Sequence, residues 1–176
     1  FIRPRRFGKS LTVNMLQHYY DILAKDKFEA LFSDLYIGKH PTRDRNSYLV
    51  LYLNFSGIVG ELHNYRKGLD AHCQTMFDYF CDIYADYLPK GIKEELDKKE
   101  GAVEQFEYLF TERNKTNQRI YLFIDEYDHF TNAILSDIES LHRYTDETYG
   151  ESYLRAFFNK IKAGPIPASS VVSSPA

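Results

Sequence analysis

Four stretches of the chain repeat their apolar residues every three or four positions, the spacing that predicts helices packed on a core. The first begins at Leu11 and runs to about Ala24, and the second begins at Tyr65 and continues until Pro89 ends it. Two shorter helices are predicted around Val103–Phe110 and Tyr153–Ile161. The stretch Lys90–Glu100 is charged and is predicted to be a solvated linker or a helix end.

Two short apolar runs lie between these helices and read as buried strands. The first is "YLVLYLNFS" at Tyr48–Ser56, and the second is "IYLFID" at Ile120–Asp125. Strands that are separated by helices predict a parallel sheet. The sequence therefore predicts an α/β fold.

The last residues, "AGPIPASSVVSSPA", have a different composition from the rest of the chain. They contain three prolines, four serines and no charged residue. This composition is typical of a linker, and we expect residues 163–176 to be disordered or altered relative to the domain formed by residues 1–162.

Size and charge limit the possible functions only weakly. The 176 residues, 44% of them hydrophobic, are enough for one globular domain with a core. A formal net charge of -3 gives no overall attraction to nucleic acid or to an anionic membrane, and no apolar run approaches the ~20 residues of a membrane span. Cys73 and Cys81, about 12 Å apart along one predicted helix, are expected to be reduced core thiols of a cytoplasmic protein.

The opening stretch "RPRRFGKS" carries half of a phosphate-binding loop. In the pattern G-x-x-x-x-G-K-[ST], backbone N–H groups surround phosphates, the lysine reaches the β- and γ-phosphates, and the hydroxyl holds Mg²⁺. Gly8, Lys9 and Ser10 fit the second half and precede a predicted helix, whereas Arg3 stands where the first glycine is expected. Taken alone, Gly-Lys-Ser before a helix is a weak signal, and a solvated basic turn that caps a helix is the simpler interpretation.

A second motif strengthens the interpretation. The strand "YLFID" ends in Asp125 and Glu126, the form of a Walker B element, in which the first carboxylate binds Mg²⁺ and the second polarises the attacking water. Carboxylates at strand ends also occur as ordinary solvated residues. Two motifs in the expected order, each next to the expected element, predict a nucleotide-binding protein.

The strings "RPRRFGKSL" and "LFIDEYD", with "LFSDLYIG" and "LNFS" between them, closely resemble the bacterial AAA-ATPase-like family. The resemblance covers residues 1–162 and implies a P-loop NTPase-like, three-layer fold with a mainly parallel sheet. It accounts for Arg3, because the family replaces the first loop glycine with Arg-Pro. Similar family members continue into a PD-(D/E)XK nuclease-superfamily domain, of which this chain has no counterpart.

The same resemblance predicts that this chain is a fragment. Similar family members have an apolar strand before the Arg-Pro pair, of which Phe1 and Ile2 remain, and a strand resembling "FITGVSP" after the late helix. We therefore expect the sheet to be truncated and the isolated chain to be marginally stable.

The motifs give each candidate site residue a role. The backbone of Arg6, Phe7 and Gly8 is expected to surround the phosphates together with Leu11, the second residue after Lys9. Lys9 is expected to contact the β- and γ-phosphates of ATP. The residues predicted to hold Mg²⁺ are Ser10 and Asp125, and the residue predicted to activate water is Glu126.

Other residues near the motifs keep two interpretations. The opening stretch also contains a basic cluster, Arg3, Arg5 and Arg6. This cluster either neutralises phosphate or binds nucleic acid, or it is a solvated face of the loop. Asp128 is either a helix N-cap or part of the site, and His129 either orients a water or phosphate or lies on the surface.

Three functions follow from these residues. The first is Mg²⁺-dependent ATP binding and hydrolysis, for which Glu126 argues, and the second is a nucleotide-binding switch or interaction module with little hydrolysis. The third is a nucleic-acid-associated protein that uses the basic loop. For the full-length protein, nucleic acid and a second copy of the chain remain possible partners, and a membrane is not expected.

Overall fold

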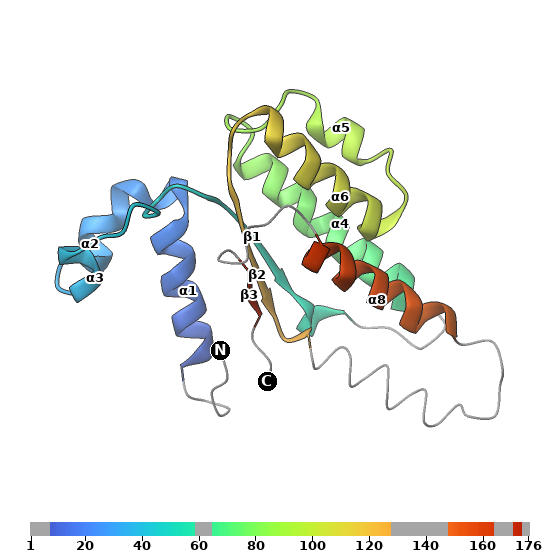
Figure 1. The fold of residues 1–176 in the computed structure, drawn as a ribbon, viewed down its shortest axis with the longest axis horizontal. Coiled ribbons are helices and arrows are strands. Elements are labelled where there is room, and N and C mark those ends of the chain that lie inside the picture. The colour runs from blue at the N-terminus through green and yellow to red at the C-terminus, as the bar shows by residue number, and fades with distance from the viewer. Residues whose placement is uncertain (1–7, 59–64, 128–147, 164–170, 174–176) are drawn as a thin grey trace.

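A small parallel sheet with helices on both faces forms the centre of the computed structural model, which describes residues 8–58, 65–127, 148–163 and 171–173 (Figure 1). The strands are β1 (Leu49–Asn54), β2 (Ile120–Asp125) and β3 (Val171–Ser173), in the order β1-β2-β3, and both neighbouring pairs are parallel. The α/β class and the parallel sheet are therefore confirmed.

One face of the sheet carries α1 (Lys9–Tyr20). Alternate residues of β1 point to opposite faces, so that Leu49, Leu51 and Leu53 are buried on one side while Val50 and Tyr52 lie under α1. The layer beneath α1 is aromatic, and its members are Val13, Tyr48, Tyr121 and Phe123, with Leu16, Tyr20, Val50 and Tyr52 packed against them. The ring of Tyr20 stacks on that of Tyr121 with 4.4 Å between centroids, which places the end of α1 near the start of β2.

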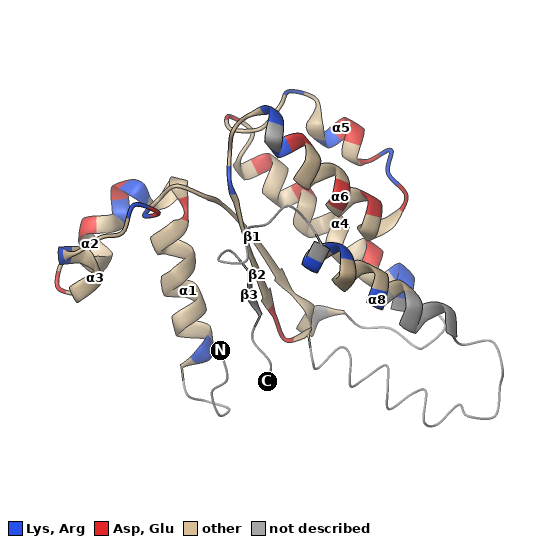
Figure 2. Cartoon of the chain, in the orientation of Figure 1, with Lys and Arg blue, Asp and Glu red and all other residues tan. Residues whose placement is uncertain are grey.

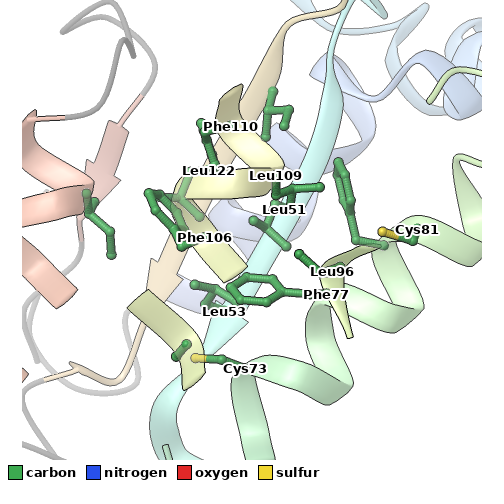
Figure 3. Close-up of a cluster of buried hydrophobic side chains, with 14 of the residues drawn as sticks. Leu51, Leu53, Cys73, Phe77, Cys81, Leu96, Phe106, Leu109, Phe110 and Leu122 are labelled. Atoms are coloured by element: carbon green, nitrogen blue, oxygen red, sulfur yellow. The ribbon is translucent and has the colours of Figure 1, made fainter. Parts of the chain in front are cut away.

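The opposite face is covered by α4 (Tyr65–Ile83), α6 (Gly101–Glu112) and α8 (Thr148–Ala163). Figure 3 shows the centre of this larger core, where side chains of α4 and α6 pack on β1 and β2. Its fully buried members include Leu51, Leu53, Phe77, Phe106, Leu109 and Leu122. All six residues of β2 are buried, because α1 covers one face of this strand and the α4–α6 layer covers the other.

The outer edge of β1 is capped by side chains and by the chain that follows α1. The hydroxyl of Tyr84 accepts a hydrogen bond from Val50 N at 3.0 Å and donates one to Asp21 Oδ1 at 2.8 Å. Asp21 also forms an isolated parallel bridge with Tyr48. These contacts satisfy backbone groups that an edge strand would otherwise leave unpaired.

The same contacts end α1 at Tyr20, four residues before the predicted end at Ala24. Tyr48 N donates to Tyr20 O and Ile22 N donates to Tyr48 O, which draws the chain into an extended conformation. The Asn46 side-chain amide donates to the carbonyls of His18 and Asp21 and so caps the end of the helix. The prediction of a helix through Ala24 is therefore wrong at its end.

Three short elements follow α1 that the sequence pattern did not predict. They are a 3-10 helix at Ile22–Lys27, α2 (Phe28–Phe32) and α3 (Tyr36–Lys39). Phe28 and Phe32 bury their rings against Tyr19 and form a small core separate from the main one. Helices α2 and α3 lie at one side of the molecule, away from α4 and α6 (Figure 1).

Two further predictions need correction in the α4–α6 layer. Helix α4 ends at Ile83, before Pro89, because Tyr87 N bonds to Tyr84 O in a tighter turn. The stretch predicted as a solvated linker or helix end, Lys90–Glu100, contains α5 (Ile92–Leu96), whose terminal residues are both buried in the main core.

Part of the final stretch also differs from the expectation. Val171–Ser173 form β3, which pairs in parallel with Leu122–Ile124 of β2, so these three residues are not disordered. Without β3, the backbone groups on the side of β2 away from β1 would be unpaired, and two β-branched valines suit a strand at this position. Residues 164–170 and 174–176 lie outside the described residues.

Cys73 and Cys81 are both free and buried in the main core, as predicted. Burial, followed by the negative charge of Asp78, raises the pKa of the Cys81 thiol to about 12. In the part of the chain that the structure describes, no helix has the length and apolarity to cross a membrane.

Candidate functional site

The start of α1 and the ends of β1 and β2 meet at one edge of the sheet. Helix α1 runs against the direction of the strands, so that Lys9 at its first turn lies beside Asp125 at the last position of β2. Figure 2 shows this basic helix start and the acidic strand end at the same end of the molecule. Two motifs that are 117 residues apart in sequence therefore form one cluster.

Lys9 contacts both carboxylates of the cluster. Its Nζ donates to Glu126 Oε1 at 3.0 Å and lies 3.3 Å from Asp125 Oδ1. The side chains of Lys9 and Asp125 are 15% and 5% exposed, whereas that of Glu126 is 35% exposed. Burial lowers the pKa of Lys9, but the hydrogen bonds to Glu126 and Asp125 outweigh it and leave the pKa raised, so the ammonium stays charged.

Glu126 has an unusual backbone conformation. Its φ is 56°, in the left-handed region that costs a residue with a side chain about 1 kcal/mol or more. Its backbone N donates to Asp125 Oδ1 at 3.1 Å, which ties the two acidic residues together. This turn directs the Glu126 side chain back toward Lys9.

Two residues of β1 complete the cluster. The Tyr52 hydroxyl donates to Asp125 Oδ2 at 3.1 Å, and the amide of Asn54 donates to the Tyr52 oxygen at 3.2 Å. Neither residue stands in a sequence motif, and neither was predicted. Their signal was the alternation of "LVLYLN", in which Tyr52 and Asn54 share a face of β1 at its carboxyl end, next to the end of β2.

The first turn of α1 has the form of an anion-binding terminus. Gly8 precedes the helix with φ 72°, a conformation that a residue with a side chain rarely adopts, and its position is exposed. Among the described residues no side chain caps the helix start, and the first turn contains no acidic residue. The first-turn N–H groups and the positive end of the helix dipole thus suit a negatively charged group.

The remaining predicted residues are only partly placed. Ser10 and Leu11 are exposed in the first turn of α1, beside Lys9 in sequence. The others lie outside the described residues: Arg3, Arg5, Arg6, Phe7, Asp128 and His129. The structure therefore brings Lys9, Asp125 and Glu126 together.

The cluster offers two kinds of chemistry. The Glu126 carboxylate is exposed enough to take a proton from a nearby water, and the Asp125 carboxylate offers oxygen to a hard cation. Within the described ranges, no group of three His, Cys, Asp or Glu side chains is placed to hold a metal alone. A cation here would need further oxygen ligands, such as those of phosphates or water.

Comparison with known proteins gives one match. The family model described as "AAA-ATPase_like: Predicted AAA-ATPase" matches residues 1–172, almost the entire chain. Searches of curated proteins and of solved structures gave no match. Since the family model covers both motifs and far more than half of the chain, the chain belongs to the AAA-ATPase-like family.

Proposed function

We propose that this chain binds ATP with Mg²⁺ and hydrolyses it, using a P-loop NTPase-like fold. The observation that carries the proposal is the contact of Lys9 with both Asp125 and Glu126. Family membership adds independent support, because it suggests ATP binding.

The phosphates of ATP would lie at the start of α1. The backbone of Arg6, Phe7 and Gly8 and the first-turn N–H groups through Leu11 would surround them. Lys9 would turn from the carboxylates toward the β- and γ-phosphates. The left-handed Gly8 supports this role, because it leaves the approach to the helix start free of a side chain.

The donor set of the site fits Mg²⁺ in a nucleotide complex. Such an ion needs only one or two protein ligands besides phosphate oxygens and water, and Asp125 and the Ser10 hydroxyl would supply them. Bound there, the ion would neutralise charge on the phosphates. Tyr52 already holds one Asp125 oxygen, which leaves the other oxygen toward Lys9 and α1.

Glu126 would act as the general base for the attacking water. Glu126 Oε1 accepts a hydrogen bond from the Lys9 ammonium. Once Lys9 turns toward the phosphates, this bond is broken and Oε1 becomes free to take a proton from water. The left-handed backbone at Glu126 keeps its side chain at the strand end, where such a water would lie.

Replacement of this carboxylate tests the proposal. Glu126→Gln should bind ATP as well as the original protein but lose at least about a hundredfold in turnover, since an amide cannot accept the proton. Glu107→Gln is the matched control, because Glu107 pairs with Lys160 on the surface of α6 and should leave turnover unchanged. Equal turnover of Glu126→Gln and the original protein would refute the role of Glu126.

A nucleotide-driven switch is the second candidate. The same Lys9 cannot contact both carboxylates and the phosphates, so binding would exchange one set of contacts for the other. If the protein binds ATP but Glu126→Gln and the original protein both show no turnover, this reading replaces the enzymatic one. Association of the full-length protein with nucleic acid or with itself, a cytoplasmic location, and the division at residue 162 remain proposals from sequence.

A further inference from the structure

The aromatic layer beneath α1 contains one hydroxyl that packing does not explain. Tyr52 of β1 lies directly opposite Phe123 of β2, so phenylalanine already occupies this level of the layer. The other tyrosines of the layer use their hydroxyls away from the acidic strand end: that of Tyr48 pairs with Asp44 and Arg119, and that of Tyr121 with Tyr20. The Tyr52 hydroxyl instead donates a hydrogen bond to Asp125 at the acidic strand end.

A chain of three hydrogen bonds fixes the direction of this contact. Ser56 N donates to Asn54 Oδ1 at 2.9 Å, which assigns the oxygen of that amide and leaves its NH₂ group toward Tyr52. The Tyr52 oxygen therefore accepts from Asn54 Nδ2 and directs its single proton to Asp125 Oδ2.

This hydrogen bond gives the two oxygens of Asp125 different partners. Oδ2 accepts from Tyr52, while Oδ1 faces Lys9 and the Glu126 backbone N–H. The carboxylate cannot rotate without breaking the Tyr52 bond. When Lys9 moves away, Oδ1 is left aimed at the start of α1.

We propose that Tyr52 is a positioning residue, held by Asn54, that orients the Asp125 carboxylate for a divalent cation bound with nucleotide. The inference rests on the proposed function, and it adds a residue outside both sequence motifs.

The test measures metal binding without turnover. Mn²⁺ is titrated into the full chain with saturating ADP, and free Mn²⁺ is counted by electron paramagnetic resonance. Tyr52→Phe keeps the ring and removes only the hydroxyl, and it should weaken Mn²⁺ binding by about 10- to 100-fold, the usual effect of losing a partner of a metal ligand. The affinity for ADP without metal should not change, because the hydroxyl of Tyr52 bonds to Asp125 and Asn54 and not to the residues proposed to hold the phosphates.

Tyr121→Phe is the matched control, since it removes a hydroxyl from the same layer but none from Asp125. It should lower the melting temperature about as much as Tyr52→Phe and leave Mn²⁺ affinity intact. If Tyr52→Phe does not fold, Asn54→Ala decides, because it retains Tyr52 but releases its hydroxyl from the fixed orientation, and Mn²⁺ binding should again weaken.

Two results would overturn the inference in different ways. If folded Tyr52→Phe, or Asn54→Ala in its place, binds Mn²⁺ as tightly as the Tyr121→Phe control, Tyr52 has only a packing role. The proposed ATP site would then stand. Absence of ADP-dependent Mn²⁺ binding in the original protein would instead overturn the proposed function, and the inference with it.

Discussion

Removal of the Lys9 charge should destabilise the protein even without added nucleotide. Lys9→Met keeps the length of the side chain but leaves the buried Asp125 carboxylate and the half-buried Glu126 carboxylate next to each other without a cation. Two like charges in a partly buried site cost free energy of folding.

The size of the effect follows from the geometry. At 3.3 and 3.0 Å, each attraction is about 5 kcal/mol for an effective dielectric constant of ~20, and desolvation of Lys9 and Asp125 offsets most of it. Solvent screens the share of Glu126, which is 35% exposed. We expect a net loss of about 2 kcal/mol, between the ~0–1 of exposed pairs and the ~3–5 of broken buried pairs.

The assay is thermal and urea unfolding of Lys9→Met. A loss of about 2 kcal/mol should lower the melting temperature by about 4–8 °C in a chain of this size. Adding Glu126→Gln to Lys9→Met should recover part of the loss, because it removes one of the two facing charges.

Lys93→Met is the matched control. Lys93 Nζ lies 2.7 Å from Asp82 Oδ1, closer than Lys9 is to either carboxylate, but both partners are well exposed. Its loss should therefore have no measurable effect. The reasoning would be refuted if Lys9→Met were no less stable than Lys93→Met.

Two further predictions concern the fold. Tyr84→Phe removes the hydroxyl that bonds both Val50 N and Asp21 Oδ1, and it should cost about 2 kcal/mol in urea unfolding, whereas Tyr79→Phe at an exposed site of α4 should cost nothing measurable. Burial, more than the effects of acidic or tyrosine neighbours, raises the pKa of Tyr52, Tyr121 and Tyr153 to about 12 from an ordinary value of 10.0. Because the folded state keeps these groups neutral, their contribution to stability is complete below pH 10 and is lost as the pH rises to about 12; a melting temperature that stays constant through this range would contradict the assignment.

The sequence predicted the centre of the fold more accurately than its edges. Ile120–Asp125 was predicted to the residue, because a strand buried on both faces is an uninterrupted apolar run. The end of α1 was missed because it depends on Asn46, a residue 25 positions beyond Asp21 whose amide caps the helix. Helix α5 was missed because charged residues outnumber its two buried positions, Ile92 and Leu96.

The candidate site divides in the same way. Lys9, Asp125 and Glu126 were predicted because each stands in a motif next to a helix or strand, and the parallel sheet brings those ends together. Tyr52 was not predicted, since a tyrosine in a strand usually serves only to pack against the core. Its role depends on the register that sets Asn54 opposite Asp125. The amino-acid pattern of one strand does not show how that strand is aligned with its neighbour.

Binding of Mg-ATP tests the central claim most directly. Thermal melts of the original protein, Lys9→Ala and the control Lys25→Ala are compared with and without Mg-ATP; Lys25 is an exposed lysine of the 3-10 helix after α1. At a hundredfold excess over the dissociation constant, binding should stabilise the original protein and Lys25→Ala by about 2.7 kcal/mol, and Lys9→Ala should show no shift. No shift in the original protein, or an equal shift in Lys9→Ala, would contradict a phosphate site at the start of α1.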